Sequence, residues 1–552
     1  MSVKNKNNQN INLNNDMNND ILRRRKFSRR DAISAGAKIS LAAIGGIIVG
    51  AIGGYVASSM AAPASTTTIT QRITETITST VGAATVTQTI TNTVTSTVTI
   101  TKTPTVTEII PIVSPTAPLE ETIADIVTEV TGKRPTETYK PFAGITLRGL
   151  LIGGGAYEAL YQIIPIFEKV TGATVDSTTR LSHFELNKKL VIEAEAKSDK
   201  FDFFSDHTSF FAGWADFHLP LNDYITGTDK NDFLGKVFEA CEYEGNILIL
   251  PRHSDSRLVY YRTDLFEDEN MKAKFKQQYG YELEGPPKDW NQWFDMAKFF
   301  TNAPEIYGFV FTGKEEALTG TIYEATVAAG GNFFDEDWNP IMNDEPGVQA
   351  LTHYVRLYQE KTTPPGVPNY LWDEVNSLFR AGKVAFLFDW PGWYSLVKES
   401  EVGGKFDLAI YPKGPANKIA VWSGSHAFGV NKYSKNQEIA IALVKVLTSA
   451  PALYFEAVST GAIPTRKSSL EQFIKDAEKS PDPRDSKRLR LLMEVMDKYY
   501  LPVPKTGEWS RISDAFWPEA QKAILGQKSP KEALDTIAQK VREIMREAGY
   551  YT

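Results

Sequence analysis

The stretch ITLRGLLIGGGAYEALYQIIPIFEKVTGATVDST, residues 145–178, decides the fold class. Residues 145–152 form a short apolar run, and apolar residues then recur at helical spacing through residues 157–170. Residues 174–178 predict a second strand, and residues 184–196 predict a second helix. This alternation predicts an α/β fold, a parallel sheet covered by helices. Ligands of such sheets bind at the carboxyl ends of the strands, so we expect the binding loops there.

Composition narrows the function classes. The chain has 552 residues, 42% of them hydrophobic, so it can bury a substantial core. A net charge of -7, without a basic run after the N-terminal region, argues against nucleic acid as a partner. The single Cys241 excludes an intramolecular disulfide and a cysteine-rich zinc site. The 6 histidines are scattered along the sequence, which argues against a histidine-based metal centre, and no cofactor is expected.

The first 62 residues have the pattern of a membrane or export segment. Residues 1–22 are rich in asparagine and predict a disordered cytoplasmic tail. Residues 23–62 join a basic block to an uncharged apolar run of about 24 residues, enough to cross a bilayer as a transmembrane helix. Charges on the N-terminal side place that end in the cytoplasm, so we expect a single-pass protein of the cell membrane with an extracellular receptor. A signal peptide cleaved near residues 60–64 is the alternative.

Residues 63–141 are rich in threonine and proline and predict a stalk. Every odd position from Thr85 to Thr107 is threonine, often alternating with valine or isoleucine. Low complexity of this kind cannot build a packed core, and the period of two favours an extended spacer. The alternative is that the alternation pairs chains into a β-structured stem.

Several segments after residue 145 carry a family resemblance. They include IFEKVTG (166–172), LPLNDYI (219–225), VYYRTDLF (259–266), FRAGKVAF (379–386) and DWPGW (389–393). Their order over some four hundred residues resembles the extracellular solute-binding proteins of ABC importers, specifically the sugar-binding branch that is similar to maltose-binding protein.

The resemblance implies a two-lobed, periplasmic-binding-protein-like fold of type II, with the ligand in the cleft between the lobes. Lobe I is expected at 142–255 plus 421–465, and lobe II at 256–420 plus 466–552. The implied function is capture of a sugar or oligosaccharide by hinge closure and delivery to the ABC permease subunits in the membrane, with no chemistry on the ligand.

Three other functions stay open, one of which, a surface-layer or adhesion stem, is suggested by the threonine-rich stalk. The family also includes receptors for glycerol phosphates and other solutes, which share the fold. A secreted glycosidase is the alternative from a different class, although no paired carboxylate motif can be picked from the sequence.

A sugar site needs flat aromatic side chains for the ring face and planar polar groups for the hydroxyls. The candidates that combine this chemistry with a position in the resemblance are Asp206, Arg257, Tyr261, Asn332, Asp389, Trp390, Trp393, Trp422 and Trp509. Simpler interpretations remain: a helix N-cap for either aspartate, a hinge ion pair for Arg257, and turn chemistry for Asn332. One of Trp509 and Trp517 is expected in the core.

Overall fold

The computed structural model describes residues 66–81, 84–99 and 119–551. They belong to two compact units, residues 1–111 and residues 112–552. The predicted tail (1–22) and membrane segment (23–62) lie outside the described residues. Within the described part, no single helix has the length and apolarity to cross a bilayer, and α16 (Gln437–Leu447) and α17 (Ala450–Thr460) meet that test only as a pair bent by 49°.

The threonine-rich segment forms an antiparallel hairpin in the first unit. Strands β1 (Thr66–Val81) and β2 (Ala84–Thr99) pair over their whole length, from Thr66 opposite Thr99 to Val81 opposite Ala84. At about 3.3 Å per residue, each strand of 16 residues spans roughly 53 Å. The extended backbone is as predicted, and the β-pairing, which the alternative placed between chains, occurs within one chain.

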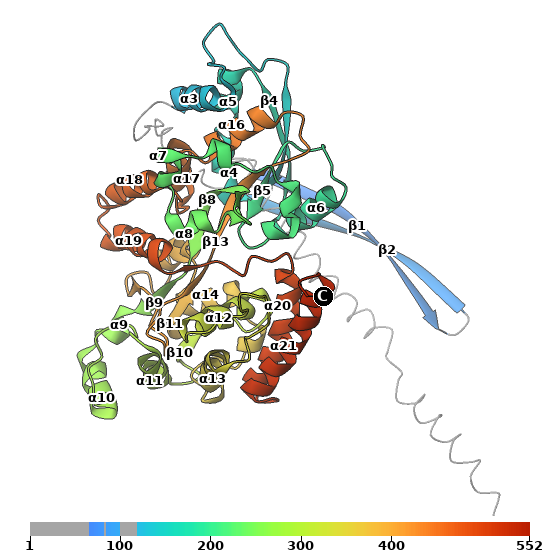
Figure 1. Cartoon of the computed structure of the whole chain (residues 1–552). Helices are drawn as coiled ribbons and strands as arrows, with labels where there is room; N and C mark the ends of the chain where they lie inside the picture. Colours follow the sequence, from blue (N-terminus) through green and yellow to red (C-terminus); the bar gives the residue numbers. More distant parts are fainter. Residues whose placement is uncertain (1–65, 82–83, 100–118, 552) are drawn as a thin grey trace, which may run out of the picture. The chain divides into compact units, whose positions relative to one another are not determined.

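Lobe I, the upper lobe in Figure 1, is built on a six-stranded sheet. Its strands are β3 (Thr146–Ile152), β4 (Thr174–Leu181), β5 (Phe203–His207), β8 (Ile249–Ser256), β13 (Val421–Val430) and β14 (Tyr500–Leu501). β3 pairs in parallel with β4 and β5, whereas β13 is antiparallel to both β5 and β8. The two strands predicted at 145–152 and 174–178 are confirmed, and they are parallel neighbours.

Helices pack around this sheet. They are α3 (Leu119–Thr131), α4 (Gly155–Tyr161), α5 (Ile164–Thr171), α6 (His183–Glu195), α7 (Gly227–Asp232), α8 (Gly235–Glu239), α16 and α17, with short 3₁₀ turns η1 (Phe211–Phe217) and η2 (Asn222–Tyr224) and a small hairpin of β6 (Glu242–Tyr243) and β7 (Asn246–Ile247). The single helix predicted at 157–170 is two helices. Pro165 opens α5, where its missing N–H costs nothing, but it could not continue α4.

Lobe I begins earlier in the chain than the sequence predicts. Leu119, Ile123 and Val127 of α3 are buried in the lobe I core, and the helix contacts α5 and α16. Residues 119–131 are therefore part of the receptor, although they fall within the segment 63–141 expected to form the stalk. Leu119, Ile123 and Val127 are spaced four residues apart, which gives α3 one apolar face, and this face explains why the helix packs on the lobe I core.

Lobe II has a four-stranded sheet in the order β10, β11, β9, β12. Its strands are β9 (Leu258–Arg262), β10 (Tyr307–Val310), β11 (Val384–Asp389) and β12 (Phe406–Ala409). Its helices are α9 (Thr263–Phe266), α10 (Glu269–Tyr279), α11 (Trp290–Phe300), α12 (Glu315–Ala328), α13 (Glu345–Gln359), α14 (Trp372–Arg380), α15 (Tyr394–Lys398), α20 (Trp509–Ile524) and α21 (Pro530–Glu547), with 3₁₀ turns η3 (Val367–Asn369) and η4 (Pro391–Trp393). β10 and β11 are parallel, and β9 is antiparallel to both of its neighbours.

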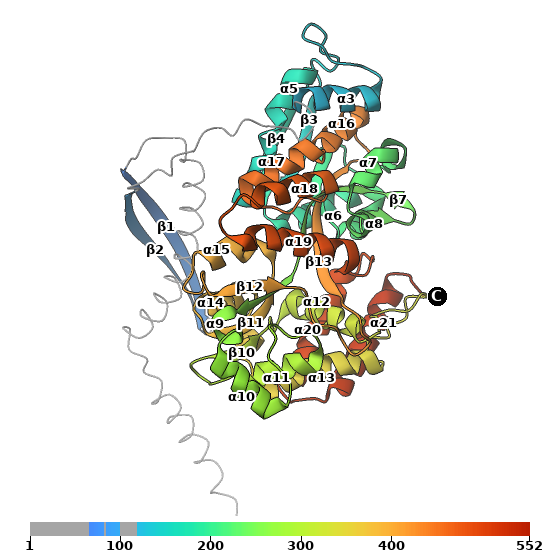
Figure 2. The same ribbon diagram turned by 90° about the vertical axis from the view of Figure 1, so that its left-hand side faces the viewer.

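The chain crosses between the lobes at Arg257, between β8 and β9, and again on the way from β12 to β13. Helices α18 (Lys467–Ala477) and α19 (Pro483–Lys498) lie at this junction (Figure 2). α18 contacts α17 of lobe I, while α19 contacts α8 and β8 of lobe I as well as β12 of lobe II. Residues 467–498, expected in lobe II, thus join the two lobes.

Candidate functional site

A pocket of about 240 Å³ lies between the lobes. Residues of lobe I form one wall: His183, His207, Ser209, Phe210, Asp255 and Gly424. The opposite wall comes from lobe II and the start of β13: Glu316, Trp372, Trp390 and Trp422. The Asp255 carboxylate and two imidazoles on one wall are therefore across from the tryptophan rings and the Glu316 carboxylate on the other.

Three tryptophans form the aromatic wall. Trp390 follows β11, Trp372 opens α14, and Trp422 lies on β13. The Trp390 ring centroid is 5.4 Å from that of Trp372 and 5.5 Å from that of Trp422, in edge-to-face geometry that favours mutual attraction. Two of these rings, Trp390 and Trp422, were predicted from the sequence. Trp372 was not predicted, and the sequence gives no sign of its role beyond its position at the start of a helix.

Arg257 supports the aromatic wall. The residue is 2% exposed, and its Nη2 lies 2.6 Å from Glu324 Oε1 on α12. The guanidinium carbon is 5.2 to 5.6 Å from the ring centroids of the three tryptophans, within cation–π range. Arg257 was predicted to contact the ligand. The structure instead shows the hinge ion pair that was its alternative interpretation.

Asp389 was also predicted to contact the ligand, but its carboxylate is fully buried. Oδ2 accepts a hydrogen bond of 2.8 Å from Asn376 Nδ2, and Oδ1 accepts one of 2.9 Å from the backbone N–H of Trp390. Burial raises the pKa of Asp389 to about 7, against the opposing effect of these two hydrogen bonds. Its role in the structure is to fix the start of the loop that carries Trp390.

Four of the 6 histidines, scattered in sequence, gather beside the pocket. His207 on β5 is directly opposite His426 on β13, which is directly opposite His253 on β8. Both neighbouring pairs of ring centroids are 4.8 Å apart, and the His183 ring lies 5.6 Å from that of His426. The scattered positions in the sequence therefore do not keep the histidines apart in the fold, because strand pairing brings them onto one face.

Burial lowers the pKa of His207 and His426 well below the usual value, and the neighbouring rings add to the effect. Both imidazoles are neutral at pH 7. Gly424 makes room for this arrangement, since a Cβ there would lie 2.6 Å from His207 Cε1. Tyr157 completes the cluster, with its hydroxyl 3.2 Å from His426 Nε2.

The structure gives the other candidate residues protein partners rather than a place in the pocket wall. Asp206 accepts hydrogen bonds of 2.8 Å from Trp214 Nε1 and 2.7 Å from the backbone N–H of His207, and its Oδ2 lies 2.8 Å from His218 Nε2. The Tyr261 hydroxyl donates to Asp407 on the neighbouring strand β12 at 3.3 Å. Neither side chain is free for a solute in this conformation.

Asn332 and Trp393 also lie outside the pocket wall. Asn332 is exposed after α12, and its side-chain oxygen accepts from the backbone N–H of Phe333 at 2.8 Å, which is turn chemistry. Trp393 ends the turn η4, three residues beyond Trp390, and is partly buried.

Of Trp509 and Trp517, the sequence analysis expected one in the core. Trp509 is that residue, at 1% exposure, and Trp517 is partly buried against the same core. Trp509 Nε1 donates a hydrogen bond of 2.7 Å to Glu316 Oε1. Because Glu316 lines the pocket, Trp509 orients a pocket carboxylate without lining the pocket itself. Burial raises the pKa of Glu316, and the hydrogen bond from Trp509 opposes that rise.

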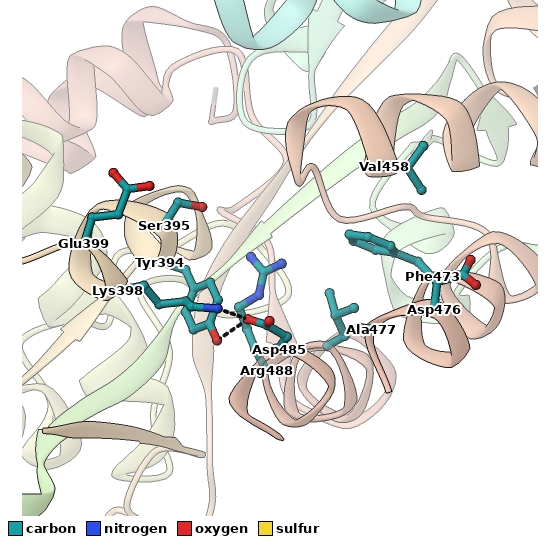
Figure 3. Close-up of a pocket in the computed structure, with 11 residues that line it drawn as sticks. Tyr394, Ser395, Lys398, Glu399, Val458, Phe473, Asp476, Ala477, Asp485 and Arg488 are labelled. Carbon is teal, nitrogen blue, oxygen red and sulfur yellow. Dashed lines mark hydrogen bonds and ion pairs between the residues drawn. The ribbon is translucent and has the colours of Figure 1, made fainter. Parts of the chain in front are cut away.

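A second cavity, of about 540 Å³, lies between α15 and the helices α17, α18 and α19 (Figure 3). Two of its charged groups, Lys398 and Asp485, pair with each other. Lys398 Nζ and the Tyr394 hydroxyl both point to Asp485 Oδ1, each at 2.7 Å. Among the described residues no tryptophan lines this cavity, so it lacks the aromatic wall that the pocket between the lobes has.

Known proteins are similar to this chain in sequence and in fold. Residues 154–453 match the family model described as bacterial extracellular solute-binding protein. A probable ABC transporter-binding protein of Deinococcus radiodurans is 29% identical over 330 residues, 58% of this chain and 74% of that protein. A mannitol-binding protein of Pseudomonas aeruginosa is 26% identical over 357 residues, 61% of this chain and 78% of that protein.

Solved structures agree with these matches. A maltose-bound protein of T. maritima superposes with a TM-score of 0.59 at 26% identity, covering 72% of this chain and 100% of that chain. The family match spans more than half of the sequence, and the two-lobed α/β architecture accompanies it. The chain therefore belongs to the bacterial extracellular solute-binding protein family.

Proposed function

We propose that this chain is the solute-capturing component of an ABC importer, and that its solute is a small polyhydroxylated compound, either a monosaccharide or a linear polyol. The observation that carries the proposal is the pocket between the lobes, where three tryptophans and Glu316 face Asp255 and two imidazoles. Aromatic rings suit the C–H face of such a solute, and carboxylates accept hydrogen bonds from its hydroxyls.

The size of the pocket favours the smaller end of the predicted sugar or oligosaccharide range. Its volume of about 240 Å³ lies just under the roughly 300 to 1,000 Å³ of pockets for drug-sized ligands. An oligosaccharide would require the lobes to stand further apart. The relative of P. aeruginosa is named for mannitol, a compound of the smaller size.

Both lobes contribute to the pocket, which supports capture by hinge closure. Asp255 lies at the end of β8, directly before the crossing at Arg257, while Glu316 and Trp390 belong to lobe II. A solute that contacts both walls stabilises the closed form over the open one. Closure then signals occupancy to the permease in the membrane.

The placement of the receptor outside the cell is part of the proposal and rests on the sequence. The basic block followed by the uncharged run in residues 23–62 supports a single membrane-spanning helix with a cytoplasmic N-terminus. The threonine-rich segment would then connect the membrane helix to the receptor, although its hairpin adds little length to that connection, because Thr66 and Thr99 at its two ends are paired.

A binding screen on the purified chain tests the function. Tryptophan fluorescence and calorimetry would be recorded with mannitol, a ketohexose, maltose and glycerol 3-phosphate, and the solutions analysed for products. We expect saturable binding of a polyol or monosaccharide without turnover. Binding of the phosphorylated compound alone would contradict the assignment of the solute, and release of glucose from maltose would support the glycosidase alternative.

A further inference from the structure

The paired histidines His207, His426 and His253 lie beside Asp255, and together they include residues of the kinds that bind metal ions. His253 and Asp255 are two residues apart on β8, so their side chains leave the same face of the sheet. His426 on β13 is directly opposite His253. One ligand atom from each of the three residues lies within 4.8 Å of the other two, and His426 Nε2 is 3.9 Å from Asp255 Oδ2.

Two imidazoles and one carboxylate are the ligands that zinc and its neighbours in the first transition row prefer. With bonds of about 2.1 Å, a tetrahedral ion holds its ligand atoms roughly 3.3 Å apart. The distances here, 3.9 Å between His426 and Asp255 and at most 4.8 Å within the group, are longer by roughly 0.6 to 1.5 Å, a difference that rotations of the three side chains can close. All three residues lie on paired strands of one sheet, so the backbone that holds them is rigid.

A further carboxylate stands behind His253. Glu456 Oε1 lies 3.4 Å from His253 Nδ1, and Arg252 Nε holds the same oxygen at 2.7 Å. His253 Nδ1 is buried and forms no hydrogen bond with any described residue. A metal on the other ring nitrogen would turn Nδ1 into a defined donor, and Glu456 is placed to accept its proton, as outer carboxylates do in metal sites.

His207 is not part of the ligand set, although it is paired with His426. Its Nδ1 accepts a hydrogen bond of 3.1 Å from the backbone N–H of Ser209. The proton of the neutral ring is therefore on Nε2, which leaves no lone pair for a metal.

We propose that His253, Asp255 and His426 bind one divalent transition-metal ion of the zinc class at the lobe I wall of the pocket. Asp255 lines the pocket itself, so the remaining coordination positions of the ion face the space for the solute. Water or a solute hydroxyl completes the coordination there. The inference does not depend on the identity of the solute, because the ion is held by the protein alone.

Metal titration of the full-length chain, prepared without a histidine tag and treated with a chelator, tests the site. We expect calorimetry with Zn²⁺ to give one saturable site per chain. Co²⁺ in place of Zn²⁺ should give the visible absorption of a four- or five-coordinate ion. An absence of saturable binding by the unaltered chain would overturn the proposal.

Three variants locate the ion. Asp255→Asn and His426→Gln should each weaken binding at least 100-fold and remove the Co²⁺ absorption, whereas His353→Gln should change neither. His353 is the matched control, since it is a partly buried histidine of lobe II that stacks on Trp290. Thermal unfolding without metal confirms that each variant is folded. Because two different ligands are substituted, the test still works if one of the two variants does not fold. Equal binding by Asp255→Asn, His426→Gln and the unaltered chain would place the ion elsewhere and overturn the proposal.

Solute binding by the chelator-treated chain separates this inference from the proposed function. A chain that binds a polyol but no Zn²⁺ refutes the metal site alone. A chain that binds Zn²⁺ at these residues but none of the solutes supports the metal site and refutes the proposed solute class.

Discussion

Arg257 and Glu324 form a buried ion pair, with Arg257 Nη2 2.6 Å from Glu324 Oε1. Arg257 separates β8 from β9 at a crossing between the lobes, and Glu324 lies on α12 of lobe II. Glu324 Oε2 also accepts a hydrogen bond of 2.7 Å from the backbone N–H of Trp422. One carboxylate thus ties the hinge to the aromatic wall of the pocket.

Breaking this pair from one side should be costly. Arg257→Met is expected to lower the free energy of unfolding by about 3 to 5 kcal/mol, because it leaves the Glu324 carboxylate buried without its partner. Glu324→Gln in the same chain removes that charge and keeps an oxygen for Trp422, so the double variant should recover part of the loss. Chemical denaturation of the two single variants and the double variant measures the coupling. Losses that simply add would contradict the pairing.

Stability should fall with rising pH because of Asp389. Burial raises its pKa from 3.8 to about 7 in the folded chain. Below pH 3.8 the Asp389 carboxyl is protonated in both the folded and the unfolded chain. As pH rises through the pKa of the folded chain, the stabilisation of the folded state is lost. The loss between pH 5 and pH 8 is about 3 kcal/mol. Asp389→Asn should remove this slope, so the variant gains stability over the unaltered chain as pH increases.

The surroundings of Asp389 can accept the amide. Asn376 Oδ1 is buried and accepts no hydrogen bond from any described residue, so a rotated Asn376 amide can accept a donor from position 389. Denaturation curves at pH 5 and pH 8 decide the question. A difference between variant and unaltered chain that is the same at both pH values would count against the titration of Asp389.

The fold could be predicted from sequence because its signals are local. The strands at 145–152 and 174–178 are short apolar or alternating runs, and the order of segments that follows them carries the family resemblance. The limits of lobe I could not be predicted as well. α3 lies beside a threonine-rich segment in sequence, and its burial depends on α16, some three hundred residues later.

The pocket could be predicted only in part. Trp390 and Trp422 stood out as aromatic residues at strand ends or turns, and both line the pocket. The histidines did not stand out, because their proximity depends on the pairing of β5, β13 and β8. A shift of one residue in either pairing would turn a histidine to the other face, and nothing local in the sequence sets that register.

Trp390 should matter to solute binding far more than Trp393, its neighbour on the same loop. Of these two residues, only Trp390 lines the pocket. Trp390→Ala is expected to weaken binding by about 2 kcal/mol or more, roughly 30-fold, as for a tryptophan at the centre of an interface. Trp393→Ala is the matched control and should bind the solute nearly as well as the unaltered chain. Calorimetry on both variants measures this, and equal losses would mean that the loop rather than the ring is important.

Gly320 on α12 sets the position of Trp422. A Cβ at Gly320 would lie 2.3 to 2.5 Å from three atoms of the Trp422 ring, which is too rigid to yield. Gly320→Ala should therefore displace the ring, weaken solute binding tenfold or more, and lower stability by about 1 to 3 kcal/mol despite the better helix propensity of alanine. Gly392→Ala, with no atom within 4 Å of its Cβ, should change neither quantity. Unchanged solute binding by Gly320→Ala would exclude a role for the Trp422 ring.

The place of α3 in the receptor can be tested with two isoleucines of the same helix. Ile123 is fully buried against the lobe I core, whereas Ile126 is only partly buried beside it. Ile123→Ala is expected to lower the free energy of unfolding of the receptor by about 2 to 4 kcal/mol, because it removes buried methyl groups and leaves a cavity. Ile126→Ala should cost clearly less. Chemical denaturation followed by tryptophan fluorescence reports on the receptor, since tryptophans occur only after residue 213. If α3 belonged to the stalk, as the sequence analysis expected, neither substitution would move that transition, and equal effects of the two would argue against the packing of α3 on α16.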